Sequence, residues 1–167
     1  MIKRGGAQTE GIFRISISNK KLSFYANKIA EHQSYAIEES EEPHVPACLL
    51  KYFLRAIPEP VIPNYDKAVA LGFMDYSPTE YEKFLRSLPL VNQNVLKFLS
   101  HFFTSLCSEE NLPHTKMNLE NYIIVLAPSI LCNPSSSLVN LLVSQQAEIC
   151  FLKKLFQHIR THQVDKK

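Results

Sequence analysis

The 167-residue sequence contains no tryptophan and only four glycines, three of them within the first eleven residues. It has no G-x-x-x-x-G-K-[ST] loop and no G-x-G-x-x-G turn, the signatures of phosphate and dinucleotide binding. It also lacks H-E-x-x-H and G-x-S-x-G, which mark zinc proteases and serine hydrolases. With no nucleophile and base set either, we expect no active site for a reaction of the chain's own.

Long apolar runs and an excess of one charge are also missing. No stretch approaches the roughly 18 apolar residues that span a bilayer, and the start, MIKRGGAQTEG, has no apolar core of a signal peptide. The net charge is only +2, with 18 basic and 16 acidic residues, which argues against a nucleic-acid partner. We expect a cytoplasmic protein, which other parts of a longer protein could recruit to membranes.

The cysteines form no C-x-x-C pair, and we expect reduced thiols in an apolar core rather than a zinc site. His158 and His162 share a helix face at i, i+4, but no third ligand lies nearby in the sequence. We therefore expect both histidines to face solvent and the protein to hold no metal. The four cysteines are Cys48, Cys107, Cys132 and Cys150.

A 3.6-residue apolar period dominates the sequence, and alternating runs are scarce. Ser18 is placed to cap one helix, and Ser77 with Glu80 has the capping-box pattern for another. These patterns predict an all-α domain, an irregular bundle of about seven or eight helices, occupying residues 1–167 with a frayed tail at 163–167. Helical segments are expected after Ser18, at 44–57, 77–88, 88–106 and 146–162, and from 118 to an end near Pro128.

Three features have both a structural and a functional interpretation. Arg14 follows Gly-Ile-Phe in a turn-like segment. Lys51 and Arg55 lie one turn apart on a helix face beside the apolar stripe, where they are either solvated or bind an anionic surface or a backbone carbonyl. Asn121, a poor helix former near the start of an apolar helix, can cap it, hydrogen-bond across a helix junction or contact a partner.

Four segments in this order resemble the successive blocks of a Rho GTPase-activating (RhoGAP) domain. They are TEGIFRIS, HVPACLLKYFLRAIPEPVI, SLPLVNQNVLKFLSHFF and KMNLENYIIVLAPSIL, and they lie between about residue 8 and residue 133. The resemblance implies an all-helical domain that docks a Rho- or Rac-type small GTPase in its GTP-bound state and accelerates GTP hydrolysis. The partner would hold GTP and Mg²⁺, so the domain would need no cofactor, and we expect it to be a monomer.

The resemblance also implies roles for individual residues. Arg14 would be the arginine finger that enters the nucleotide site of the GTPase. Lys51 would contact the GTPase, and Arg55 would support the finger loop through its backbone carbonyls. Pro60 is expected at the docking surface, and Asn121 is expected to touch the GTPase or the finger loop.

Several positions depart from the family pattern. Ile17 replaces a small residue after the finger, Ser129 replaces an Asn after Ala-Pro, and Thr115 replaces an Asn before Lys-Met. The segment MIKRGGAQ resembles only the tail of the family's first long helix. We expect either that the sequence is a fragment of a longer protein or that this edge of the bundle is open, which would expose apolar surface. The alternative function is a RhoGAP-fold module that binds small GTPases or other signalling partners without accelerating hydrolysis.

Overall fold

The computed structural model describes residues 5–32, 37, 38, 40–131 and 138–163, without the side chains of 32, 138–143 and 163. Over these residues it is all-α, with a short 3-10 helix and one isolated bridge between Ile62 and Leu131, so the predicted fold class is confirmed. The predicted tail beyond residue 163 lies outside the described residues. The elements are η2 (Gly6–Gln8), α1 (Asn19–His32), α2 (His44–Ala56), α3 (Tyr65–Phe73), α4 (Pro78–Ser87), α5 (Leu90–Leu106), α6 (Leu112–Thr115), α7 (Leu119–Ile130) and α8 (Leu138–Gln163).

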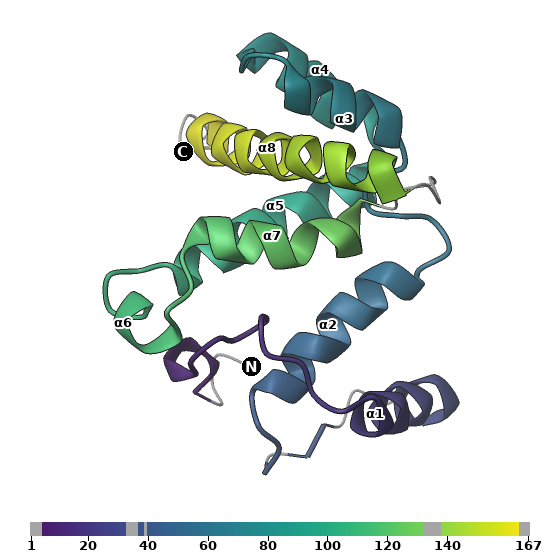
Figure 1. Ribbon diagram of the computed structural model, residues 1–167, viewed down its shortest axis with the longest axis vertical. Helices are drawn as coiled ribbons and strands as arrows, with labels where there is room; N and C mark the ends of the chain where they lie inside the picture. The colour runs from purple at the N-terminus through teal and green to yellow at the C-terminus, as the bar shows by residue number, and fades with distance from the viewer. Residues whose placement is uncertain (1–4, 33–36, 39, 132–137, 164–167) are drawn as a thin grey trace.

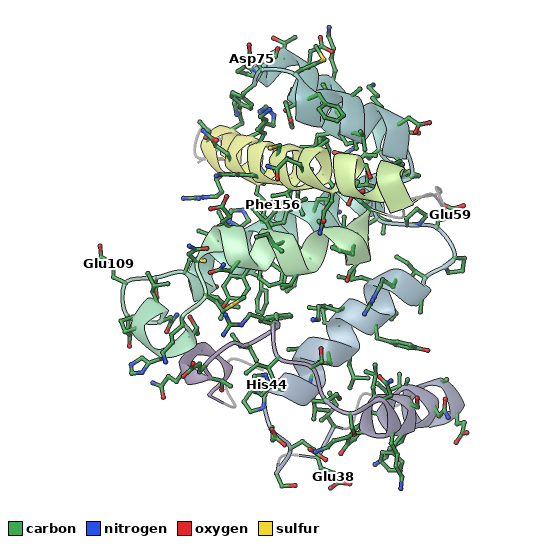
Figure 2. All side chains as sticks on the ribbon, viewed as in Figure 1. Glu38, His44, Glu59, Asp75, Glu109 and Phe156 are labelled. Atoms are coloured by element: carbon green, nitrogen blue, oxygen red, sulfur yellow. The ribbon has the colours of Figure 1, made fainter. Side chains whose placement is uncertain are left out.

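The long helix α8 lies between two groups of helices, with α3 and α4 on one side and α5 and α7 on the other (Figure 1). Gly72 of α3 lets α3 and α8 approach each other closely. A Cβ there would lie 2.1 Å from the backbone oxygen of Ala147 in α8, so any side chain would force the two helices apart. On the other side, Phe156 of α8 is fully buried against α5 (Figure 2), and its carbonyl accepts a hydrogen bond from Ser100.

Two apolar clusters hold the bundle together. The larger runs from the segment around Phe13 through α2, α5 and α7 to α8 and α4. The smaller cluster joins α1 to α2 through Tyr25, Val45 and Leu49. The helix α1 is therefore attached to the bundle through α2. Ile17, from the segment that precedes α1, packs against the same cluster.

The helix ends test the local predictions. Ser18 Oγ accepts a hydrogen bond from the Lys21 amide at 3.3 Å, so the predicted cap of α1 is confirmed. The predicted capping box of α4 is wrong, because Ser77 makes no side-chain cap bond and Glu80 instead accepts a hydrogen bond from Lys83. The helix α7 includes Pro128 and ends at Ile130, close to the predicted end near Pro128.

The expectation that both C-terminal histidines face solvent is wrong for His158, which is 1% exposed. Its Nδ1 lies 3.1 Å from the Tyr76 hydroxyl, and its Nε2 lies 3.0 Å from Glu82 Oε2. Both partners come from around α4, about 80 positions earlier, so the pattern within α8 gave no sign of them. His158 is a hydrogen-bonded core residue, and no cluster of three metal-ligating side chains occurs among the described residues.

Acid should weaken the contact between α4 and α8. Hydrogen bonds from His158 and Arg86 lower the pKa of Glu82 to about 2. Because this folded-state pKa lies below the ordinary value of 4.5, the stabilisation is complete above that value and is lost as the pH falls towards 2. We expect thermal melting at a series of acidic pH values to show a shallower decline for Glu82→Gln than for the wild type. The exposed Glu109→Gln is the control, and parallel declines for all three proteins would contradict the prediction.

Large apolar side chains are exposed along one side of α5. Val91 and Phe98 are 72% and 66% exposed, and Phe53 of α2 is 62% exposed. Phe98 stacks on the half-buried Phe102, whose ring also contacts Phe13. An apolar strip therefore leads from the core to the surface. None of the described helices is long and apolar enough to cross a bilayer.

Cysteine placement agrees with the reduced core thiols expected from the sequence at the described positions. Cys48, Cys107 and Cys150 are unpaired, and Cys132 lies outside the described residues. Burial raises the pKa of the Cys107 thiol to about 11, so this thiol is protonated and unreactive at neutral pH.

Candidate functional site

The segment 9–16, named here the Arg14 loop, is a tight turn built around Gly11. Gly11 has φ 63°, and its carbonyl accepts hydrogen bonds from the amides of Arg14 and Ile15 at 2.8 and 2.9 Å. A Cβ on Gly11 would lie 2.9 Å from the Ile15 side chain. Both the left-handed backbone and the close side chain require glycine here. The turn therefore fixes the direction in which the chain leaves Gly11.

Phe13 anchors the Arg14 loop in the core. Its ring is fully buried and makes edge contacts with Phe103, Phe102 and Tyr122 at centroid distances of 4.9, 6.0 and 6.0 Å. Its φ is 72°, a conformation that is costly for a bulky residue and persists only where the surroundings hold it. With Phe13 fixed in this way, the next side chain, that of Arg14, is directed to the exposed side of the loop.

Lys51 supports the loop from α2. Its ammonium donates a hydrogen bond to the Phe13 carbonyl, and burial lowers the pKa of the Lys51 ammonium. Arg55 is exposed, and its Nε lies 3.4 Å from the Lys51 carbonyl of its own helix. The contact to a loop carbonyl that the family resemblance implied for Arg55 is thus made by Lys51. The reason is distance along the helix, because Lys51 lies one turn nearer to the loop.

A second support comes from the connection between α6 and α7. The Gly11 amide donates a hydrogen bond to the Thr115 carbonyl at 2.8 Å, and Lys116 pairs with Glu10 at 2.8 Å. The bond from Lys116 lowers the pKa of Glu10, and the Arg14 guanidinium lowers it further. Arg14 Nη2 also lies 3.4 Å from the position of a Cβ on Gly11. In this structure the guanidinium is therefore folded back over its own turn.

Asn121 caps α7. The side-chain oxygen of Asn118 accepts from the Asn121 amide at 2.8 Å, and the side-chain oxygen of Asn121 accepts from the Asn118 amide at 3.2 Å. Of the three interpretations open from the sequence, the structure shows the cap. Ile124, one turn further along the same face of α7, is 41% exposed.

Arg55 and Pro60 lie at one hollow of about 480 Å³ between the end of α2 and the end of α7, where Pro128 and Ser129 complete the lining. Asn92 of α5 holds the chain beside it, donating to the Val61 carbonyl at 2.9 Å. The structure therefore groups the predicted residues into three places: Arg14 with Lys51, Arg55 with Pro60, and Asn121 at the start of α7.

Comparison with known proteins identifies the family to which this arrangement belongs. A family model described as the RhoGAP domain matches residues 1–135. The chain belongs to the RhoGAP domain family. The Dictyostelium discoideum protein GTPase activating protein homolog 4 is 34% identical over 137 residues, which cover 80% of this chain and 15% of that protein.

Human relatives of this RhoGAP domain are more distant in sequence. Rho GTPase-activating protein 24 is 28% identical over 78% of this chain and 18% of its own length, and Rho GTPase-activating protein 1 is 27% identical over 84% and 35%. The RhoGAP domain thus spans about a third or less of the length of these curated relatives.

Two solved structures share the fold of this RhoGAP domain. The BH domain of GRAF, the GTPase regulator associated with focal adhesion kinase, has a TM-score of 0.74 at 15% identity, covering 95% of this chain and 88% of that one. Human Rho GTPase activating protein 15 has a TM-score of 0.74 at 20% identity, covering 95% and 78%.

Sequence reasoning did not find the second support of the Arg14 loop in this RhoGAP domain. From the sequence, Thr115 is only a departure from the family pattern, and Glu10 and Lys116 have no predicted role. Thr115 acts through its backbone carbonyl, which any residue would offer at that place. The one available signal was the pair of opposite charges at Glu10 and Lys116, which means nothing until the fold brings the two residues together.

Proposed function

We propose that this RhoGAP domain binds a Rho- or Rac-type small GTPase in its GTP-bound state and accelerates GTP hydrolysis by inserting Arg14 into the nucleotide site. The observation that carries the proposal is the Arg14 loop itself. An exposed arginine directly follows a fully buried phenylalanine, on a turn held from α2 and from the α6–α7 connection. A loop with these supports presents one charged side chain from a fixed base.

The chemistry of GTP hydrolysis suits such a side chain. Negative charge spreads over the transferred phosphoryl group and the leaving oxygen in the transition state, so catalysis depends on positioning and on electrostatic stabilisation. A guanidinium is always charged and can donate two parallel hydrogen bonds, which an ammonium cannot do. Supplied by a partner protein, an arginine of this kind accelerates hydrolysis by roughly 10³ to 10⁵.

The remaining residues of the proposal surround the loop. Lys51 would position Arg14 through the Phe13 carbonyl and lie at the edge of the contact with the GTPase, while Arg55, Pro60 and Asn121 would contact the partner directly. GTP and Mg²⁺ would stay with the GTPase, and the domain would perform no reaction of its own. The resting guanidinium, folded back over the Gly11 turn, would have to swing outward when the GTPase docks.

The test is single-turnover GTP hydrolysis by a panel of Rho-, Rac- and Ras-type GTPases, measured with and without the domain. Acceleration confined to Rho and Rac members is the expected result. Binding to the GTP-loaded form without acceleration would instead establish the non-catalytic module. The proposal is refuted if the domain neither binds any member of the panel nor accelerates its GTP hydrolysis.

Replacing Lys51 with methionine should lower the maximal hydrolysis rate. The substitution keeps the apolar stem but leaves the Phe13 carbonyl without its charged donor. A lost hydrogen bond of this kind corresponds to about tenfold or more in rate if the loop must be ordered to react. Lys20→Met on the exposed side of α1 is the matched control. A raised half-saturating concentration with an unchanged maximal rate would show that Lys51 only contacts the GTPase.

A further inference from the structure

A second hollow, of about 770 Å³, opens between α5, α7 and α8, which lie side by side (Figure 1). The helix α8 contributes Lys153, Gln157 and Arg160, which recur at the spacing of one helix face. The helix α5 contributes His101 and Thr104. The two helices therefore present polar side chains to each other across an open space instead of packing together there.

The lining of this hollow has an unbalanced charge. It includes Lys153 and Arg160, and none of the described residues that line it is Asp or Glu. Lys153 forms an ion pair with Glu120, whose carboxylate lies 3.4 Å from the Lys153 ammonium. Both of these side chains are more than half exposed. Exposed pairs of this kind contribute little, so Lys153 can turn to another anion. Arg160 has no hydrogen bond or ion pair in the described part of the chain.

A hydroxyl beneath the hollow also lacks a partner. Thr104 lines the hollow, and its Oγ1 is buried without a hydrogen bond to any described residue. A buried polar atom without a partner is uncommon, because its desolvation is then uncompensated. A polar ligand or ordered water seated in the hollow would bring hydrogen-bonding atoms close to this hydroxyl.

We propose that the hollow between α5, α7 and α8 binds phosphate groups, with Arg160 and Lys153 as the principal donors. Arginine can donate two parallel hydrogen bonds to a phosphate, and lysine adds a compact charge. The space is large enough for a ring that carries several phosphates. The hollow faces away from Asn121, because Leu119, in its lining, and Asn121 are two residues apart in α7 and so about 200° apart around that helix.

Two measurements test the site and show whether its phosphate belongs to a free compound or to a lipid. The first is titration calorimetry with soluble inositol trisphosphate. The second is sedimentation with phosphatidylcholine vesicles that contain phosphatidylinositol bisphosphate. The wild type should bind, and Arg160→Gln should weaken binding about tenfold or more. Lys20→Gln removes the same charge from the exposed side of α1 and should have no effect. Binding of the soluble compound supports a free phosphate ligand, and binding of the vesicles alone supports a lipid headgroup.

Three outcomes would overturn the proposal. The first is that neither probe binds. The second is that Lys20→Gln loses as much affinity as Arg160→Gln, which would show that binding depends only on the overall charge. The third is a loss in Lys97→Gln with none in Arg160→Gln, because Lys97 lines a different hollow between α4, α5 and α8. The test is independent of the GTPase, and Arg160→Gln should leave the stimulation of GTP hydrolysis unchanged.

Discussion

Replacing Arg14 with alanine is expected to remove most of the stimulation of GTP hydrolysis, a loss of about 10³ or more in the single-turnover rate at saturating domain. The side chain is exposed, and its described contacts are confined to its own loop. The melting temperature and the affinity for the GTP-loaded GTPase should therefore change little. The rate and the affinity are measured separately, by single-turnover hydrolysis and by binding to a GTPase loaded with a non-hydrolysable analogue.

Arg14→Lys is the informative control for this prediction. It keeps a positive charge at the same place but cannot form two parallel hydrogen bonds, so it should recover only a small part of the rate. If the alanine variant stimulates hydrolysis as well as the wild type, Arg14 is not the finger. If the lysine variant is fully active, charge alone is sufficient and the proposed geometry is wrong.

Replacing Phe13 with alanine should have the largest effect on stability and should abolish stimulation as well. The ring is fully buried among Phe102, Phe103 and Tyr122, and removing such a side chain costs about 3–5 kcal/mol of unfolding free energy. Without the ring the left-handed backbone at this residue is held only by hydrogen bonds of the loop, such as that from Lys51 to the Phe13 carbonyl, so Arg14 loses its apolar anchor. Denaturant unfolding and the hydrolysis assay, on the same preparation, measure both effects.

The chain offers a matched control in Phe24, which is 57% exposed on α1. Phe24→Ala should leave stability and stimulation nearly unchanged. Phe13→Leu retains most of the apolar volume and should recover much of the stability, which separates the anchoring role from unfolding. A Phe13→Ala variant that remains both stable and active would show that the supports from α2 and from the α6–α7 connection are sufficient without the anchor.

The helices were predictable because their information is local. The 3.6-residue period located α2, α4, α5, α7 and α8, and the Ser18 cap was also correct. The predicted capping box of α4 is a local error, since Ser77 makes no side-chain cap bond, whereas the error over His158 concerns contacts between distant segments. His158 looked like a surface residue within α8, and only the packing of α4 against it, which brings Glu82 into contact, makes it a core residue.

The candidate site shows the same division. The Gly-Ile-Phe-Arg turn drew attention to Arg14 because glycine and a buried aromatic act on their immediate neighbours. The sequence could not show that Lys51 rather than Arg55 binds the Phe13 carbonyl. Both residues lie on the same helix face, and only the position of that carbonyl distinguishes them. The contacts of Asn121 with a GTPase remain a prediction, because its described role is the cap of α7.

The supports of the Arg14 loop also determine when the loop can form during synthesis. The hydrogen bond from Lys51 to Phe13 joins residues 38 positions apart, and the ion pair between Lys116 and Glu10 joins residues 106 positions apart. A chain emerging from the ribosome makes Arg14 early, but it cannot complete the loop until the segment that contains Thr115 and Lys116 has left the exit tunnel. A nascent or truncated chain that ends before that segment would carry the arginine without its full support.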